Sequence, residues 1–251
     1  MINFFRRIRQ NLLNENKFSK YLLYAIGEII LVVIGILIAL QVNTWKEDKS
    51  IAKSEKKYMQ NLKEDLQMDI QVFDSYFKKN QEIYQIIDST IAYLSREDFK
   101  ETSDKSAYSA RMVSARWNRI QPVERTYEQM KSSGQLKIIS SQIVSDMISD
   151  YYNSLYELET YNEAILRWLE GYLKLMGQVF DGKVLFEIFK TKSPVPTQNN
   201  VLITEDTKII NELITSAQYV YGGIKLSEKI VKQNRSKAEK LILEIERSYG
   251  E

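Results

Sequence analysis

YLLYAIGEIILVVIGILIALQV, residues 21–42, is the stretch that decides the fold. It carries one charged side chain, Glu28. As an α-helix it would be roughly 33 Å long at about 1.5 Å per residue, which matches the hydrocarbon core of a bilayer at about 30 Å. Helices of globular proteins seldom have an apolar circumference over such a length. The stretch therefore predicts a transmembrane helix.

The main alternative to a permanent span is a cleaved signal peptide, because the residues before the stretch are basic. The apolar region of a signal peptide is shorter, and no small-x-small cleavage site follows Leu40. An uncleaved signal anchor fits both observations. Trp45 lies just beyond the apolar run, where an indole ring suits the membrane interface, so we expect it to act as an interfacial anchor.

The count of basic residues does not give the direction of insertion. Five lie in the 20 residues before the stretch and five in the 20 after it, so the positive-inside rule is tied. A signal anchor usually has a short basic tail inside and a long domain outside. We therefore expect a cytoplasmic tail at residues 1–20 and an extracytoplasmic domain at residues 43–251. The spacing of Phe5, Ile8 and Leu12 makes the tail either a short amphipathic helix or a frayed end.

One face of the predicted span has small side chains. At about 100° per residue, Glu28, Gly35 and Ala39 share this face, and the small pair permits close approach of another helix. The face predicts a helix-packing stripe. The alternative is that Glu28 only extends toward the headgroups without a packing role.

The composition narrows the fold and the function. Three prolines and nine glycines in 251 residues are too few for the turns of an all-β protein, which favours an all-α fold. The chain has no histidine and no cysteine, which excludes Ser-His-Asp triads, thiol nucleophiles and the usual zinc sites. A net charge of +2 does not suggest a nucleic-acid partner. We expect no enzyme activity, no cofactor and no metal.

The rest of the sequence predicts long helices. Apolar residues continue at helical spacing after Trp45, Gly134 suits a helix C-cap, and Ser141 suits an N-cap. The helices expected from these signals cover residues 46–94, 126–133, 142–180 and 204–245. The fold class is thus all-α: one N-terminal transmembrane helix continues into an antiparallel bundle of about four helices.

Two pairs of neighbouring residues lead to further expectations. Gly222 and Gly223 lie in the middle of the last predicted helix and mark either a kink or a close helix contact. Tyr151 and Tyr152 point about 100° apart on a helix, so we expect at most one of them to be deeply buried.

The opening FFRRIRQNLL, the segment KYLLYAIGEIILVVIGILIALQVNTWKED, the segment PVERTYEQMKSSGQLKII and the later DYYNSL carry a family likeness. The sequence resembles an uncharacterised family of single-span membrane proteins of the Bacteroidota, a domain of unknown function. The family has no assigned activity to transfer. The resemblance implies a location in a Gram-negative inner membrane, with the helical domain in the periplasm.

The densest polar and aromatic cluster lies around Pro122 and predicts a pocket for a small anionic ligand. The alternative is structural: Trp117 and Tyr127 would pack in the core, and the arginines would pair with Glu124, Glu128 and neighbouring carboxylates. The candidate ligand-binding residues are Arg116, Arg119, Arg125, Tyr127, Ser132 and Ser133.

Two functions fit these features. The first is a noncatalytic, membrane-anchored helical module that binds an envelope protein or a second copy of itself. The second is a ligand-sensing extracytoplasmic bundle that recognises a small anion and reports through a separate partner. The lipid bilayer is a partner in both.

Overall fold

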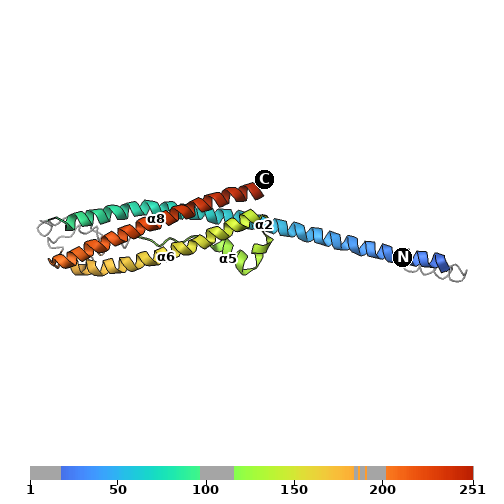
Figure 1. The fold of residues 1–251 in the computed structure, drawn as a ribbon, viewed down its shortest axis with the longest axis horizontal. Helices are drawn as coiled ribbons and strands as arrows, with labels where there is room; N and C mark the ends of the chain where they lie inside the picture. Colours follow the sequence, from blue (N-terminus) through green and yellow to red (C-terminus); the bar gives the residue numbers. More distant parts are fainter. Residues whose placement is uncertain (1–17, 97–115, 184–185, 187–189, 191–201, 251) are drawn as a thin grey trace. The chain divides into compact units, whose positions relative to one another are not determined.

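The computed structural model describes residues 18–96, 116–183, 186, 190 and 202–250. Its elements are α2 (Phe18–Leu94), α5 (Arg125–Ser132), the 3₁₀ turn η1 (Gln135–Ile138), α6 (Gln142–Val179) and α8 (Thr207–Tyr249) (Figure 1). In the described part there is no strand, only an isolated bridge between Phe180 and Leu202. The predicted all-α class is confirmed. Residues 1–17 of the predicted tail lie outside the described residues.

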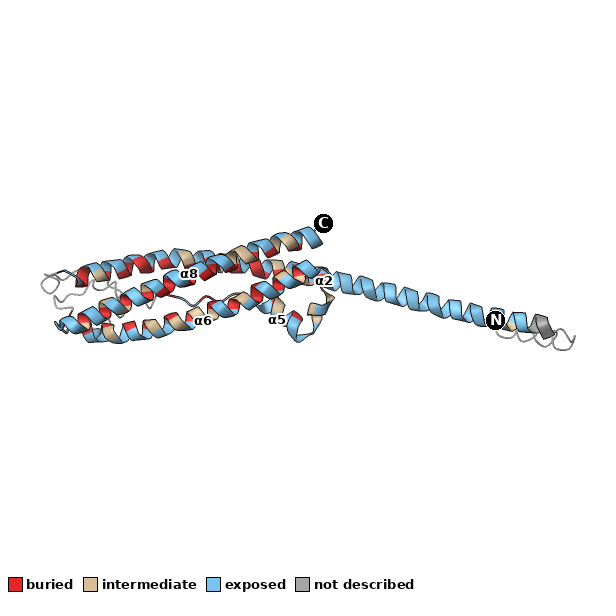
Figure 2. Cartoon of the chain, in the orientation of Figure 1, coloured by how far each residue is buried: buried red, intermediate tan, exposed pale blue. Residues whose placement is uncertain are grey.

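The chain divides into two compact units, residues 1–57 and 58–251, and α2 contributes to both. Within the described residues, α2 is the one helix long and apolar enough to cross a membrane. None of its most apolar window is buried (Figure 2). An uncovered surface of this kind would be unfavourable in water, since each buried apolar Å² contributes about 25 cal/mol.

Three long helices build the second unit: α2 from residue 58 onward, α6 and α8 (Figure 1). Each presents one buried stripe to the others and an exposed face outward (Figure 2). Contacts between Lys63 and Glu246 and between Asn80 and Glu228 show that α8 runs antiparallel to α2. The predicted bundle of long helices is therefore confirmed.

An extended segment, residues 117–124, takes the place of a fourth long helix. Arg116 contacts Glu82 and Val123 contacts Asp69, so the segment runs back along α2 toward its N-terminal side. Ile120 contacts Asn162 of α6, and Tyr151 of α6 contacts Asp69. As a result α2 and α6 are parallel, and only α8 is antiparallel to both. Pro122 explains the lack of helix, because proline has no N–H to donate and disfavours helical backbone in the residue before it.

Local signals place most helix ends correctly. Gly134 has a left-handed backbone (φ 66°) after α5, and the Ser141 hydroxyl accepts the Val144 N–H at the start of α6. The predicted start of the last helix at residue 204 is wrong by three positions. The Asp206 carboxylate accepts the Lys208 N–H at 2.8 Å, so Asp206 is the N-cap and α8 begins at Thr207.

The two glycines of α8 differ in their surroundings. A Cβ on Gly223 would lie 2.1 Å from the Trp168 ring, whereas a Cβ on Gly222 would meet nothing within 4 Å. Gly223 therefore marks a close contact between α8 and α6. Gly222 has no such packing role.

Candidate functional site

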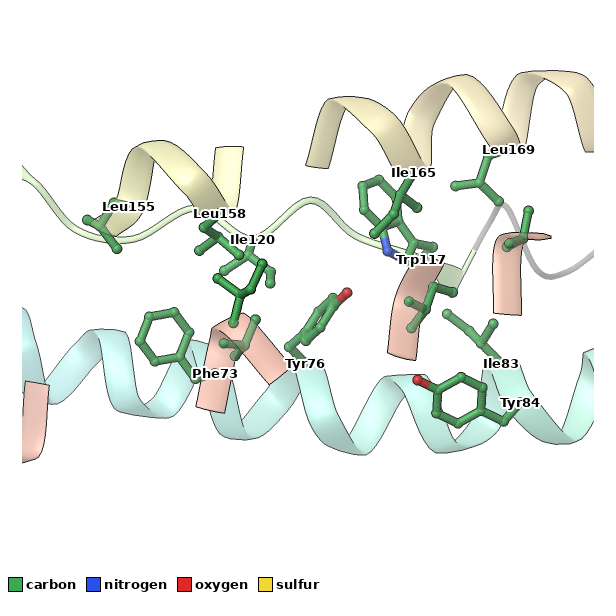
Figure 3. Packing of buried hydrophobic residues seen from close by; sticks show 14 of the residues in the cluster. Phe73, Tyr76, Ile83, Tyr84, Trp117, Ile120, Leu155, Leu158, Ile165 and Leu169 are labelled. Carbon is green, nitrogen blue, oxygen red and sulfur yellow. The ribbon is translucent and has the colours of Figure 1, made fainter. Parts of the chain in front are cut away.

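The segment around Pro122 lies in the seam between α2 and α6. Trp117 and Ile120 are buried and lie between Phe73 and Tyr76 of α2 and Ile165 of α6 (Figure 3). The expectation that Trp117 packs in the core is confirmed. Apolar burial alone leaves the backbone of an extended segment without partners, and buried peptide groups need hydrogen bonds.

Asn162 of α6 supplies two of these hydrogen bonds. Its side chain is fully buried, its Oδ1 accepts the Ile120 N–H at 3.4 Å, and its Nδ2 donates to the Ile120 carbonyl at 3.1 Å. The amide thus pairs with both the N–H and the carbonyl of one residue, as a neighbouring β-strand would. Asn162 therefore fixes the register of the segment on α6.

Asp69 of α2 holds the next point of the segment. Its carboxylate accepts the Val123 N–H at 2.6 Å and the Tyr151 hydroxyl at 2.6 Å. The pKa of Asp69 is raised to about 6, mainly because the carboxylate is buried. The two hydrogen bonds lower this pKa, and the nearby Asp65 and Glu124 carboxylates raise it. Asp69 therefore links α2, the segment and α6 at one buried point.

Asp65, one turn earlier on α2, holds the start of α5. Its carboxylate accepts the Thr126 N–H at 2.9 Å and the Arg125 guanidinium at 2.5 Å. The N-cap of α5, Glu124, makes no side-chain capping bond. Asp65 therefore caps α5 from another helix, where a carboxylate also suits the positive end of the helix dipole.

We call Asp65 and Asp69, with their bonds to residues 123–126, the acidic clasp. Both carboxylates are fully buried and lie four residues apart on the face that also carries Leu62, Leu66 and Phe73. Neither residue was among the candidate site residues predicted from the sequence. One sequence signal could have indicated them: two acidic residues occupy positions of α2 that the helical spacing of the apolar residues assigns to the core. Among the described residues no group of three or more acidic side chains could hold a metal ion.

The predicted arginines go to three different carboxylates. Arg116 pairs with Glu82 at 2.6 Å, Arg119 pairs with Glu159, and Arg125 pairs with Asp65 of the clasp. Asp65 and Glu82 are about 25 Å apart along α2 at about 1.5 Å per residue, so Arg116 and Arg125 do not line one pocket. Arg pairing with carboxylates is confirmed, although the partners are not the predicted Glu124 and Glu128.

Arg119 does line a cavity. The cavity has a volume of about 560 Å³ and lies between α2 and the extended segment. Lys79 and Ser75 of α2 and Asn118 and Gln121 of the segment also line it. Among the predicted ligand-binding residues, Arg119 alone contributes to this cavity, whose ligand stays a prediction.

The remaining predicted residues belong to α5 and its end. Tyr127 stacks on Tyr152 with ring centroids 4.0 Å apart and planes 6° apart. The hydroxyls of Ser132 and Ser133 both donate to the Gln129 carbonyl, at 3.2 and 2.7 Å. The two serines thus close the last turn of α5 rather than face a shared cavity with the arginines.

The expectation that only one of Tyr151 and Tyr152 is deeply buried is wrong. Both are buried, Tyr151 by its contact with the clasp and Tyr152 by the covering ring of Tyr127. Burial raises the pKa of both phenols, so both stay neutral. Tyr151 donates its hydroxyl proton to Asp69. The expectation considered only one buried face of the helix. Tyr127 of α5, which is distant in sequence, covers Tyr152 on a second face.

A larger groove, with a volume of about 900 Å³, lies between α6 and α8. Trp168, Gly171 and Leu175 line it from α6, and Thr215 and Tyr219 line it from α8. Tyr219 is 63 % exposed. The exposed surface of the groove is mainly apolar, although polar side chains also line it: Arg167, Lys208, Asn211, Glu212 and Ser216. None of the lining residues was among the candidates predicted from the sequence.

The predicted membrane residues all lie on the first unit's part of α2. Gly35, Ala39 and Trp45 are exposed, and a Cβ on Gly35 would meet nothing within 4 Å. The Glu28 side chain is partly buried and is not without an interaction partner. The Lys49 ammonium lies 4.2 Å from the Trp45 ring centroid. Helix packing through Glu28, Gly35 and Ala39 stays a prediction.

These features define an all-α protein with one apolar N-terminal helix and a three-helix bundle, in which the extended segment 117–124 is anchored by the buried Trp117 and Ile120. The chain belongs to the family of unknown function DUF6090, which matches residues 28–193. The match covers residues 28–42 of the apolar stretch, the acidic clasp, α5 and α6. No curated protein and no solved structure matches the chain. The predicted resemblance to a family without an assigned function is confirmed.

Proposed function

We propose that this chain is a noncatalytic, membrane-anchored module that binds a partner protein in the cell envelope. Residues 21–42 cross the inner membrane of a Gram-negative bacterium of the Bacteroidota, residues 1–20 lie in the cytoplasm, and the bundle lies in the periplasm. The uncovered apolar surface of α2 supports the anchor. The direction rests on the usual arrangement of signal anchors and on the family resemblance.

The observation that carries partner binding is the groove between α6 and α8. Arg167, Trp168 and Tyr219 line this groove, whose exposed surface is mainly apolar. Trp, Tyr and Arg dominate the energetics of protein interfaces. Its volume of about 900 Å³ is large enough for several side chains of a docked helix. The buried polar groups of the clasp are engaged inside the bundle, which fits a scaffold better than a catalyst.

Two glycines of α6 give a matched test of the groove. Gly171 lines it, Gly177 does not, and both are exposed with open space around their Cβ positions. Gly171→Lys fills the groove, whereas Gly177→Lys adds the same charge and the same helix propensity elsewhere. We expect native membranes extracted in mild detergent to yield a stoichiometric partner with the native chain and with Gly177→Lys, and to lose it with Gly171→Lys.

Equal recovery of the partner with both variants would remove the groove from the proposal. Recovery of no stoichiometric partner with the native chain would contradict partner binding itself. If the recovered partner is a second copy of the chain, the stripe of Glu28, Gly35 and Ala39 becomes the first surface to examine. Single cysteines placed through residues 24–42 should then crosslink with helical periodicity, and uniform crosslinking would exclude the stripe.

A second function, recognition of a small anion, is favoured by one observation. The cavity beside the extended segment presents Arg119 and Lys79 together with amide and hydroxyl donors. An incoming anion would compete with Glu159 for Arg119. Binding would thus couple the ligand to the contact between the segment and α6.

Phosphate and small carboxylates provide the probes for this second function. We expect them to raise the melting temperature of the native chain in detergent and to lose this effect in Lys79→Gln and Arg119→Gln. Arg116→Gln is the control, since Arg116 does not line the cavity. A stabilisation that survives both cavity variants would show nonspecific ion effects instead.

A further inference from the structure

The part of α2 directly after the apolar stretch separates its charges onto two sides. At about 100° per residue, Trp45 and five lysines fall within an arc of about 120°, whereas the acids Glu47, Asp48 and Glu55 fall within about 100° on the other side. We call the lysine side the lysine face: Lys46, Lys49, Lys53, Lys56 and Lys57. All five lysines are exposed.

We infer that the lysine face binds anionic lipid headgroups in the leaflet where the apolar stretch ends. The inference rests on the proposed membrane anchoring and adds a lipid class to it. A one-sided array of ammonium groups beside a bilayer is complementary to phosphate-bearing lipids that carry a net negative charge. The balanced net charge of the whole chain conceals this local separation.

The spacing along the helix places the first lysines at headgroup level. Counted from Val42 at about 1.5 Å per residue, Lys46 lies about 6 Å and Lys49 about 10 Å beyond the apolar run. The headgroup layer is about 5 to 7 Å thick on each side, and a lysine stem extends several Å toward it. Lys53 and Lys57, about 17 and 23 Å out, act only through a field that decays over about 8 Å.

Trp45 supports the same placement. Its ring is exposed, and the Lys49 ammonium lies 4.2 Å from the ring centroid. An indole prefers the interface, so the pair puts an ammonium group where the phosphates are. Lys46 and Lys49 should therefore contribute most of the lipid preference, and the outer lysines less.

A unique label tests the contact, because the chain has no cysteine. Asn43→Cys, at an exposed position just past the apolar run, carries a fluorophore in the otherwise native full chain. The chain is reconstituted in bilayers of phosphatidylcholine and phosphatidylglycerol, with a nitroxide quencher on the acyl chain of one lipid or the other. We expect a roughly fivefold local enrichment of phosphatidylglycerol, which molar salt abolishes.

Two double variants distinguish an effect of the lysine face on lipid preference from an effect of the total charge of the chain. Lys46→Gln with Lys49→Gln should equalise quenching by the two lipids. Lys229→Gln with Lys232→Gln, two exposed lysines of α8, should leave the preference intact. Equal quenching in the native chain, or a preference that survives without Lys46 and Lys49, would overturn the inference. If alkaline carbonate releases the chain from membranes, the anchoring fails as well; if the chain stays bound, only the headgroup contact fails.

Discussion

The hydroxyl of Tyr151 donates a 2.6 Å hydrogen bond to the carboxylate of Asp69, so α6 is joined to α2 through one buried acid. The same carboxylate accepts the Val123 N–H from the extended segment. Three parts of the chain that are distant in sequence thus share one ionisable group. Its protonation should affect the stability of the whole bundle.

The raised pKa of Asp69 makes the free energy of unfolding depend on pH in a defined way. Burial raises its pKa from 3.8 to about 6 in the folded chain, so the folded state holds the proton more tightly than the unfolded state. The resulting stabilisation is fully present below about pH 4 and is lost as the pH rises through 6. A shift of about two units corresponds to about 3 kcal/mol of unfolding free energy.

Asp69→Asn isolates this group from the other carboxylates that titrate in the same range. An amide cannot ionise. Its oxygen can still accept the Val123 N–H, whereas its NH2 group would donate to the Tyr151 hydroxyl instead of accepting from it. We expect the unfolding free energy of Asp69→Asn, relative to the native chain, to increase by about 3 kcal/mol between pH 4 and pH 7. Urea unfolding of the full chain in detergent, followed by circular dichroism, measures the difference. A constant difference across this range would contradict the shifted pKa.

The clasp arginine and a surface arginine should differ in their effects on stability. Arg125 pairs with Asp65, which is fully buried, whereas Arg116 pairs with Glu82, which is about half exposed. Arg125→Ala leaves a buried carboxylate with one donor fewer and should lower the unfolding free energy by about 2 kcal/mol. Arg116→Ala should cost less than about 1 kcal/mol, because water solvates Glu82.

Thermal and urea unfolding of the two alanine variants test this contrast. Both variants remove one charge and one side chain of the same kind. Equal losses of stability would show that burial of Asp65 does not matter. A larger loss in Arg116→Ala would contradict the expectation that the ion pair to the buried carboxylate contributes more to stability than the exposed pair.

The glycine pair of α8 gives a second matched comparison. Gly222→Ala meets open space and should raise the unfolding free energy by about 0.5 to 1 kcal/mol through helix propensity. Gly223→Ala places a methyl group against the Trp168 ring and should lower the unfolding free energy by about 1 to 3 kcal/mol. The fluorescence of Trp168 should change only in the second variant. Similar effects of the two substitutions would contradict the close helix contact.

The sequence predicted features that depend on local chemistry. Ser141 and Gly134 were assigned as caps because a hydroxyl and a left-handed residue act on their immediate neighbours. Ser141 indeed accepts the Val144 N–H, and Gly134 has the expected backbone. The apolar helix at residues 21–42 could also be predicted, because the length and composition of the stretch indicate it without reference to the rest of the chain.

Features that depend on distant partners were not predicted. The extended course of residues 117–124 depends on Asn162 and Asp69, 42 and 54 positions away from their backbone partners. Tyr152 is buried by Tyr127, which no helical periodicity can indicate. The arginines were correctly expected to find carboxylates, but a sequence alone does not show that Asp65 is the buried one.

Membrane attachment through α2 is the claim on which the functional proposals depend, and alkaline carbonate extraction tests it most directly. Leu31→Arg with Ile38→Arg places two charges within the apolar stretch, at about 2.5 to 3.5 kcal/mol each by insertion scales. The matched control, Leu226→Arg with Leu243→Arg, changes two exposed leucines of α8. The account predicts that the native chain and the control stay in the membrane pellet while the first variant is released. Release of the native chain, or retention of the first variant, would contradict it.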